Sequence, residues 1–78
     1  MVNFAAMNIK EKIGIRIKEL REAKGLSQKD VAYAADLDRS YIASIENGAR
    51  NVSCINIEKI AKALKISMRT FFNEELFE

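Results

Sequence analysis

The feature that most constrains how this chain folds is a pattern of helix starts that recurs four times without overlap. Each copy has an apolar residue, then Ser or Asp, then three residues, then a second apolar residue. A Ser or Asp placed there can accept hydrogen bonds from the free amides of a first helical turn, while the two apolar residues pack together. The pattern therefore predicts four helices. Its copies are Leu26-Ser27-Val31, Leu37-Asp38-Ile42, Val52-Ser53-Ile57 and Ile66-Ser67-Phe71.

The signals for helix ends indicate an all-α protein. The sequence has no proline, and Gly25 and Gly48 follow apolar-periodic segments, as residues that stop a helix do. Asn8 and Glu11 have the spacing of a capping pair and mark one further helix start. We expect a compact five-helix bundle. Its predicted helices cover residues 9–24, 28–35, 39–47, 54–65 and 68–76.

Residues 27–47 predict a helix-turn-helix. Only Asp36 and Leu37 separate the second predicted helix from the N-cap of the third, and helices joined by so few residues cross steeply. Ile42 and Ile45 of the third helix have the spacing of core residues, so its opposite side is left outward. A helix presented in this way suits the major groove of DNA. The outward residues are Arg39, Ser40, Ala43, Ser44 and Asn47.

The length of the chain favours a single domain. Its 78 residues predict one domain over residues 1–78, with residues 1–7 as a loose tail. No apolar run approaches the roughly 20 residues of a membrane span. The first residues also lack the basic and apolar regions of a signal peptide. We therefore expect a cytoplasmic protein with no membrane partner.

The net charge and the residue types present exclude several classes of function. The net charge is only +2, from 13 basic and 11 acidic residues, so DNA binding must depend on where the cations lie rather than on bulk charge. With no histidine and Cys54 as the single cysteine, the sequence excludes a structural zinc site and the usual nucleophilic catalysis. Asp36 and Asp38 could in principle bind a metal, but turn formation and helix capping already explain both. We expect no cofactor and no enzymatic activity.

Residues along nearly the whole chain match one known family. They are Arg16 to Arg21, Gly25 to Gln28, Val31, Ala32, Ile42, Ile45 to Gly48 and Ile57 to Phe72. With them the chain resembles the Cro/repressor-type helix-turn-helix family. Through residues 37–42 and 50–53 it is similar to the controller proteins of restriction-modification systems. The resemblance implies a lambda-repressor-like DNA-binding domain that dimerises through its carboxyl-terminal helices. The implied partners are double-stranded operator DNA, a second copy of the chain and, as a further candidate, RNA polymerase.

The resemblance also assigns roles at the start of the predicted second and third helices. Arg39 matches the principal base reader, and its guanidinium fork suits the O6 and N7 acceptors of guanine; a contact with phosphate alone is the alternative. Gln28 matches a glutamine that anchors to the DNA backbone, and otherwise it is an ordinary exposed helix residue. Ser40 and Ser44 either read base edges or fit against the groove wall.

Residues beside and after the recognition helix extend this surface. We expect Tyr41 to rest its ring on the core and to leave its hydroxyl free for phosphate, or for a nearby thymine methyl contact. Asn47 and Arg50 match positions at which family members touch the DNA backbone. Asn51 either joins them or only shapes the loop.

Two further features concern how the recognition helix is held. Arg21 and Glu46 match a pair that links the first helix to the end of the third, which we interpret as a salt bridge; an unpaired, solvated arrangement is the alternative. Asp36 stands where the turn of the family more often has glycine. Because Asp tolerates the left-handed conformation, the turn is expected to survive at some cost.

The carboxyl-terminal segment, residues 66–78, is the expected dimerisation helix. It has more apolar surface than one face of a short helix can bury within its own domain. Phe72, Leu76 and Phe77 are therefore predicted to meet a partner subunit. The alternative is that they all belong to the core and that the tail frays.

The resulting hypothesis is a sequence-specific transcriptional regulator that binds a pseudo-palindromic operator as a homodimer. The resemblance suggests the controller of a restriction-modification system, an activator or repressor of its own promoter and that of the endonuclease. A phage-type repressor is one alternative. An antitoxin-like module that binds a partner protein and regulates its own promoter is another.

Overall fold

The computed structural model describes residues 4–78, and helices form all of its regular structure. The predicted all-α fold with five α-helices is confirmed, and no strand occurs among the described residues. Residues 1–3 of the predicted loose tail lie outside the described residues, whereas Phe4–Ala6 form a short 3-10 helix, η1. The remaining elements are α1 (Ile9–Ala23), α2 (Gln28–Ala35), α3 (Arg39–Glu46), α4 (Cys54–Ala63), α5 (Met68–Phe72) and the 3-10 helix η2 (Glu75–Phe77).

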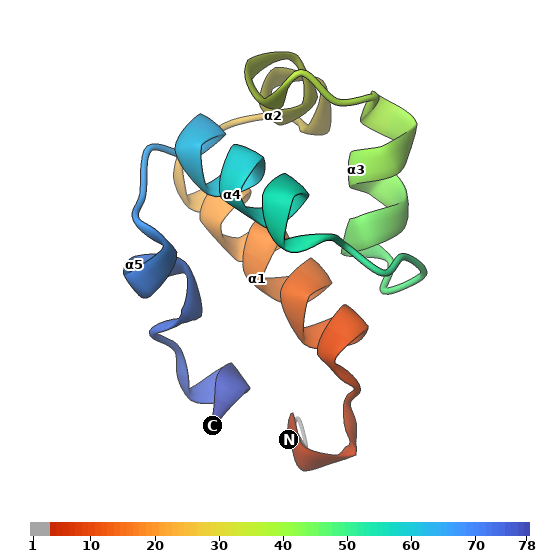
Figure 1. Cartoon of the computed structure of the whole chain (residues 1–78), viewed down its shortest axis with the longest axis vertical. Helices are drawn as coiled ribbons and strands as arrows, with labels where there is room; N and C mark the ends of the chain where they lie inside the picture. The colour runs from red at the N-terminus through yellow and green to blue at the C-terminus, as the bar shows by residue number, and fades with distance from the viewer. Residues whose placement is uncertain (1–3) are drawn as a thin grey trace.

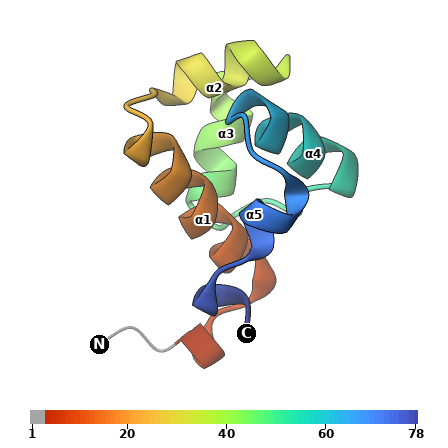
Figure 2. The same cartoon turned by 90° about the vertical axis from the view of Figure 1, so that its left-hand side faces the viewer.

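In the view of Figure 1, α1 runs along the middle of the molecule, with α3 on one side of it and α5 on the other. α3 packs against α1 and α2, and α2 also packs against α4. α5 follows α4 and lies on the side of the molecule opposite α3, as both views show (Figures 1 and 2). The third helix is therefore free to meet a large partner without involving the carboxyl-terminal segment.

Apolar side chains from every α-helix form one core. Ile17, Ile42 and Ile60 have no exposed surface, and Phe71 of α5 is equally buried. These are positions that the helical periodicity of the sequence turns inward. The other buried members of the cluster are Ile13, Val31, Ala32, Ala35, Ile45, Ile57, Ala61 and Leu64.

Side-chain caps start most of the helices as predicted. Asp38 is the exception: it has the extended backbone of an N-cap, but its side chain makes no capping hydrogen bond. At the start of α2, hydrogen bonds from the backbone and side chain of Ser27 lower the pKa of Asp30. The capping hydrogen bonds run from the amides of Glu11, Asp30, Asn56 and Thr70 to the side chains of Asn8, Ser27, Ser53 and Ser67.

Each of the first four α-helices is followed by a residue in the left-handed conformation. These residues are Gly25, Asp36, Gly48 and Lys65, so two of them are not glycine. Asp36 has φ 57°, so it takes the conformation expected of it in the turn. Lys65 has φ 60°, and α4 ends at Ala63 rather than at the predicted Lys65. After each such residue the next amide bonds a carbonyl five residues back, which satisfies the helix end. These bonds join Leu26 to Arg21, Leu37 to Ala32, Ala49 to Ser44 and Ile66 to Ala61.

The prediction of one helix over residues 68–76 is wrong, because α5 ends at Phe72. Arg16 of α1 is only 9% exposed and donates hydrogen bonds to the carbonyls of Thr70 and Phe71, both at 2.7 Å. In a continuing helix those carbonyls would accept the amides of residues 74 and 75. The chain instead turns and continues as η2, which places Leu76 in the core at 2% exposure.

Candidate nucleic-acid interface

α3 is seated closely on α1. Ile42 and Ile45 point into the core with no exposed surface. Gly14 of α1 lies directly under the carbonyl oxygens of Ile45 and Glu46, where no side chain would fit. Because this contact is backbone against backbone, it sets both the distance and the rotation of α3. The polar side of α3 is thereby turned outward.

The outward side of α3 is polar and cationic at its start. Arg39, Ser40 and Asn47 are exposed, and Ser44 is half-buried between them. Arg50 and Asn51, in the loop after α3, are exposed as well. The residues predicted to contact DNA therefore lie on α3, at the start of α2 and in this loop.

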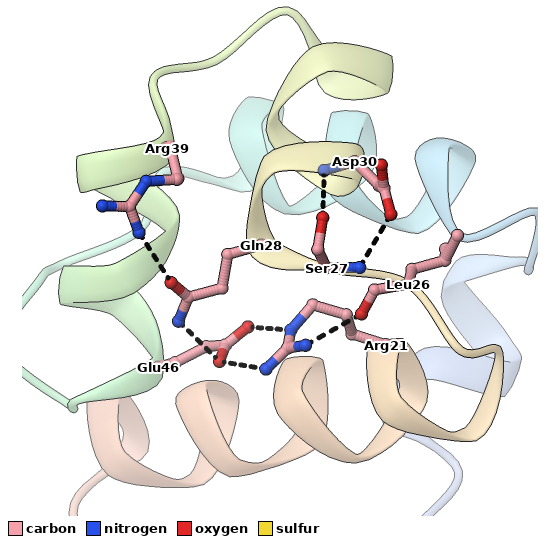
Figure 3. Close-up of polar contacts among 7 residues, drawn as sticks. All are labelled: Arg21, Leu26, Ser27, Gln28, Asp30, Arg39 and Glu46. Atoms are coloured by element: carbon pink, nitrogen blue, oxygen red, sulfur yellow. Dashed lines mark hydrogen bonds and ion pairs between the residues drawn. The ribbon is translucent and has the colours of Figure 1, made fainter.

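A buried ion pair holds the end of α3 to α1, in place of the solvated alternative. Arg21 Nε donates to Glu46 Oε2 at 2.8 Å, and Arg21 Nη2 donates to Glu46 Oε1 at 3.0 Å (Figure 3). The side chain of Arg21 is 12% exposed and that of Glu46 is 3% exposed. The hydrogen bond to Glu46 raises the pKa of Arg21 above its usual value. Arg21 Nη1 also donates to the carbonyl of Leu26 at 2.8 Å, so the pair reaches the start of α2.

Gln28 connects this ion pair to Arg39. Its Nε2 donates to Glu46 Oε1 at 3.1 Å, and its Oε1 accepts from Arg39 Nη1 at 3.3 Å (Figure 3). Because Glu46 can only accept at this contact, the amide oxygen of Gln28 is turned toward Arg39. Gln28 is thus neither an isolated exposed residue nor wholly free for phosphate. It supports the proposed base reader, and it keeps one N–H for a further acceptor.

Tyr41 and Ser44 are engaged within the protein. Asn56 Nδ2 of α4 donates to Tyr41 Oη at 3.0 Å, so the hydroxyl oxygen has a partner within the protein. Its proton can still be donated, and the expected contact with phosphate stays a prediction. Ser44 Oγ donates to the carbonyl of Tyr41 at 2.8 Å, so its proton is used while its oxygen can still accept. The guanidinium of Arg50 lies 5.1 Å from the centre of the Tyr41 ring, within the range of a cation–π interaction.

A hollow of about 390 Å³ lies beside the start of α3. Its lining includes Tyr41, Arg50 and Asn56 together with Asp36 and Asp38. Cationic and hydrogen-bonding groups thus lie next to carboxylates, which favours a partner that meets them in one orientation. Within residues 4–78 no group of three His, Cys, Asp or Glu side chains is placed to hold a metal ion.

The predicted dimer residues separate into two kinds. Leu76 is buried inside the subunit, so its side chain is not available to a partner. Phe77 is half-buried and lies against the rings of Phe71 and Phe72, at centroid distances of 6.3 and 5.0 Å. Phe72 remains exposed, at 37%. Ile55 of α4, which was not among the predicted contact residues, is also a large exposed apolar residue, at 70%.

Two residues with a structural role were not predicted from the sequence. Arg16 bonds the end of α5, on the side of the molecule opposite α3. It lies three residues after Ile13 on the core-facing side of α1, so the helical period could have indicated a buried cation. The role of Asn56 could not be predicted, because its partner Tyr41 is 15 residues away and belongs to another helix. No local signal in the sequence links these two.

Comparison with known proteins places the chain among helix-turn-helix proteins. A helix-turn-helix family model matches residues 17–71. The control protein C.MunI of a Mycoplasma species is 47% identical over 68 residues, which cover 86% of this chain and 92% of that protein. The control protein C.BamHI of Bacillus amyloliquefaciens is 47% identical over 60 residues, 76% of this chain and 74% of the relative.

Solved structures of controller proteins are also similar to this chain. The crystal structure of the restriction-modification controller protein C.AhdI from Aeromonas hydrophila is similar with a TM-score of 0.78 and 52% identity, covering 81% of this chain and 96% of that one. The controller protein C.Esp1396I, solved as a tetramer in complex with its natural 35-base-pair operator, gives a TM-score of 0.80 and 39% identity, covering 85% and 88%. No helix among residues 4–78 is long and apolar enough to cross a membrane.

Proposed function

The chain belongs to the helix-turn-helix family, among the controller proteins of restriction-modification systems, and we propose that it binds a pseudo-palindromic operator as a homodimer. The family predicted from the sequence is thus confirmed. In the proposed complex, α3 of each subunit enters the major groove of one half-site. The two half-sites lie about 34 Å apart, one turn of DNA. Such a regulator works in the cytoplasm, where its operator is.

The position of Arg39 carries the proposal. It is exposed at the start of α3, and its guanidinium donates a hydrogen bond to Gln28 Oε1 at 3.3 Å. A guanidinium can donate two parallel hydrogen bonds to O6 and N7 of guanine. Ser40 follows Arg39 on the exposed side, where a hydroxyl can meet an adjacent base edge or the groove wall. We assign Ser44 the same kind of contact, through its free lone pair.

The other polar residues would contact the DNA backbone and fix the register of the protein on the duplex. Gln28 has one N–H left for a phosphate oxygen, at the N-terminus of α2 where the helix amides favour an anion. Asn47, Arg50 and Asn51 follow along the end of α3 and the next loop, and all three are exposed. With a net charge of only +2, these placed contacts would supply most of the electrostatic attraction.

Replacement of Arg39 by alanine should weaken specific binding by about 1–3 kcal/mol and relax base preference at one position of each half-site. The operator would first be selected from a random DNA pool with the wild-type protein. Gel-shift titrations would then compare this operator with random DNA of equal length. The expected result is a loss on the operator that exceeds the loss on random DNA.

The matched control is Lys18→Ala, which removes one positive charge from an exposed site on α1 outside the proposed interface. It should reduce binding to both DNAs slightly and equally, through bulk charge alone. If Arg39→Ala behaved like Lys18→Ala, Arg39 would contact phosphate or nothing, and its assignment as base reader would be abandoned.

Dimerisation follows from the size of the domain. A single module of this kind buries too little surface for tight specific binding, so two copies are needed to choose a site. We propose that residues 66–78 form the dimer contact, with Phe72 as its exposed apolar centre, Phe77 at its edge and Leu76 as the buried support. Since α5 lies opposite α3, a contact there leaves α3 of both subunits free (Figure 1).

Phe72→Asp should raise the dimer dissociation constant about 30-fold, as expected when a central apolar residue of an interface becomes charged. Sedimentation over a range of concentrations would measure it. Tyr33→Asp is the matched control, because Tyr33 is 90% exposed on α2, away from α5. A wild-type chain that is monomeric at micromolar concentration, or equal dissociation constants for the two variants, would exclude α5 as the interface.

We further propose RNA polymerase as a second protein partner if the regulator activates transcription. Repression needs only occupation of the operator, whereas activation needs an interaction that favours polymerase binding. The sign of regulation therefore decides whether this partner is required.

A further inference from the structure

The side chain of Asn56 makes a contact that its place in α4 does not require. Asn56 lies in the first turn of α4, and its backbone amide donates to Ser53 Oγ at 3.1 Å to cap the helix. Any residue other than proline could supply that amide. The Asn56 side chain is instead directed to another helix, where its Nδ2 donates to Tyr41 Oη at 3.0 Å.

This hydrogen bond determines which way the Tyr41 hydroxyl points. A phenol oxygen has one proton and two lone pairs, and the amide nitrogen of Asn56 can only donate. The lone pair on that side is therefore occupied, so the proton of Tyr41 must point away from Asn56. Tyr41 and Asn56 both border the hollow of about 390 Å³ beside the start of α3, which Ser40, Arg50, Asp36 and Asp38 also line, so the Tyr41 side chain lies next to open space. Tyr41 thus presents a donor on the side where α3 presents Ser40.

The ring of Tyr41 also interacts with a cation. The guanidinium of Arg50 lies 5.1 Å from the centre of the Tyr41 ring, and this loop residue is otherwise exposed. When the ring is anchored through its hydroxyl, its face stays under Arg50, and the cation–π attraction keeps the guanidinium beside α3. Asn56, Tyr41 and Arg50 therefore form a connected set that runs from α4 across α3 to the loop.

We infer that Asn56 is a positioning residue for DNA recognition, which acts through Tyr41 and Arg50. It directs the hydroxyl of Tyr41 as a hydrogen-bond donor toward an acceptor on the DNA, and it keeps Arg50 beside α3 to meet a phosphate. Asn56 itself touches no DNA in this arrangement. The inference rests on the proposed function, because it concerns how the same surface binds an operator.

A double-mutant cycle tests this inference. Affinity for the selected operator would be measured for wild type, N56A, Y41F and N56A/Y41F. N56A should weaken operator binding about fivefold, the effect of one lost hydrogen bond, because the hydroxyl of Tyr41 is then free to rotate. In the Y41F background the same change should have no more than a small effect, since no hydroxyl remains to be oriented.

The ratio of the two N56A effects decides the outcome. An effect at least twofold larger in the wild-type background than in the Y41F background supports the inference. A smaller ratio overturns it, because a purely structural role of Asn56 would weaken both backgrounds alike. If wild type selected no operator at all, the proposed function would fail instead, so the two failures are distinguishable.

A second variant guards against loss of folding. Asn56→Asp keeps the size of the side chain and places a carboxylate three residues after Ser53, an arrangement that favours the helix start. A carboxylate accepts rather than donates, so it should draw the Tyr41 proton inward. The effect of Asn56→Asp is measured in the wild-type and Y41F backgrounds and judged by the same twofold ratio. The negative charge that Asn56→Asp adds is present in both backgrounds, so its effect on DNA binding cancels in that ratio. Thermal unfolding of each variant confirms that a folded protein is compared.

Discussion

Replacement of Glu46 by alanine should lower the free energy of unfolding by about 3 kcal/mol, a large part of the total for a domain of this size. The Glu46 side chain is 3% exposed, and its two oxygens accept from Arg21 Nε and Nη2. Its removal leaves the guanidinium of Arg21 largely buried without a counter-charge. Gln28 also loses its acceptor, so the support of Arg39 is lost together with stability. Urea unfolding followed by circular dichroism would measure the change.

Glu58→Ala is the control for this prediction, because Glu58 also pairs with a cation but at the surface. Its contact with Lys62 is 3.8 Å long, and the two side chains are 58% and 75% exposed. Removal of such a pair should change stability by no more than about 0.5 kcal/mol. An Arg21→Met, Glu46→Leu double variant should recover part of the stability lost in Glu46→Ala, since no unpaired charge remains. Equal effects of Glu46→Ala and Glu58→Ala would contradict the role given to the buried pair.

The second large effect is expected from Gly14→Ala. A Cβ at this position would collide with the carbonyl oxygen of Ile45 and lie 3.1 Å from that of Glu46. Both are backbone atoms of α3, so a side-chain rotation cannot relieve the clash. Alanine favours a helix over glycine by about 1 kcal/mol, but forced displacement of α3 should outweigh this and destabilise the protein by about 3 kcal/mol.

Gly25→Ala separates steric collision from the loss of backbone freedom. Gly25 has φ +68°, and no atom lies within 4 Å of the place that a Cβ would take, so alanine there meets strain but no clash. Its expected cost is about 1 kcal/mol. Thermal and urea unfolding of both variants would show the difference. A Gly14→Ala protein at least as stable as Gly25→Ala would mean that α1 and α3 can separate without cost.

The displacement of α3 in Gly14→Ala also has a functional consequence. The clash lies beside Glu46, so the distance between Glu46 and Arg21 on α1 should increase. Operator affinity should then fall by more than the unfolded fraction explains. Affinity corrected for the folded fraction, measured well below the melting temperature, would reveal this second effect.

Helix starts could be predicted almost residue by residue, because they depend on contacts between near neighbours in the chain. Ser27, Ser53 and Ser67 cap the helices that their spacing indicated. Helix ends were predicted less well. Lys65 ends α4 in a left-handed conformation without the glycine that usually marks one, so the sequence had no local signal for it.

The sequence by itself determined the starts of the helices, the helix-turn-helix and the family. Each of these follows from short-range spacing or from a motif with few alternatives. The ion pair of Arg21 with Glu46 was expected only from the resemblance to that family, and the structure decided between it and the solvated alternative. The tertiary structure alone decided that α5 stops at Phe72, that Gln28 supports Arg39 and that Asn56 holds Tyr41. These contacts join side chains from different helices. Which partners meet depends on how the helices pack, and the spacing of residues along the chain carries no information about that.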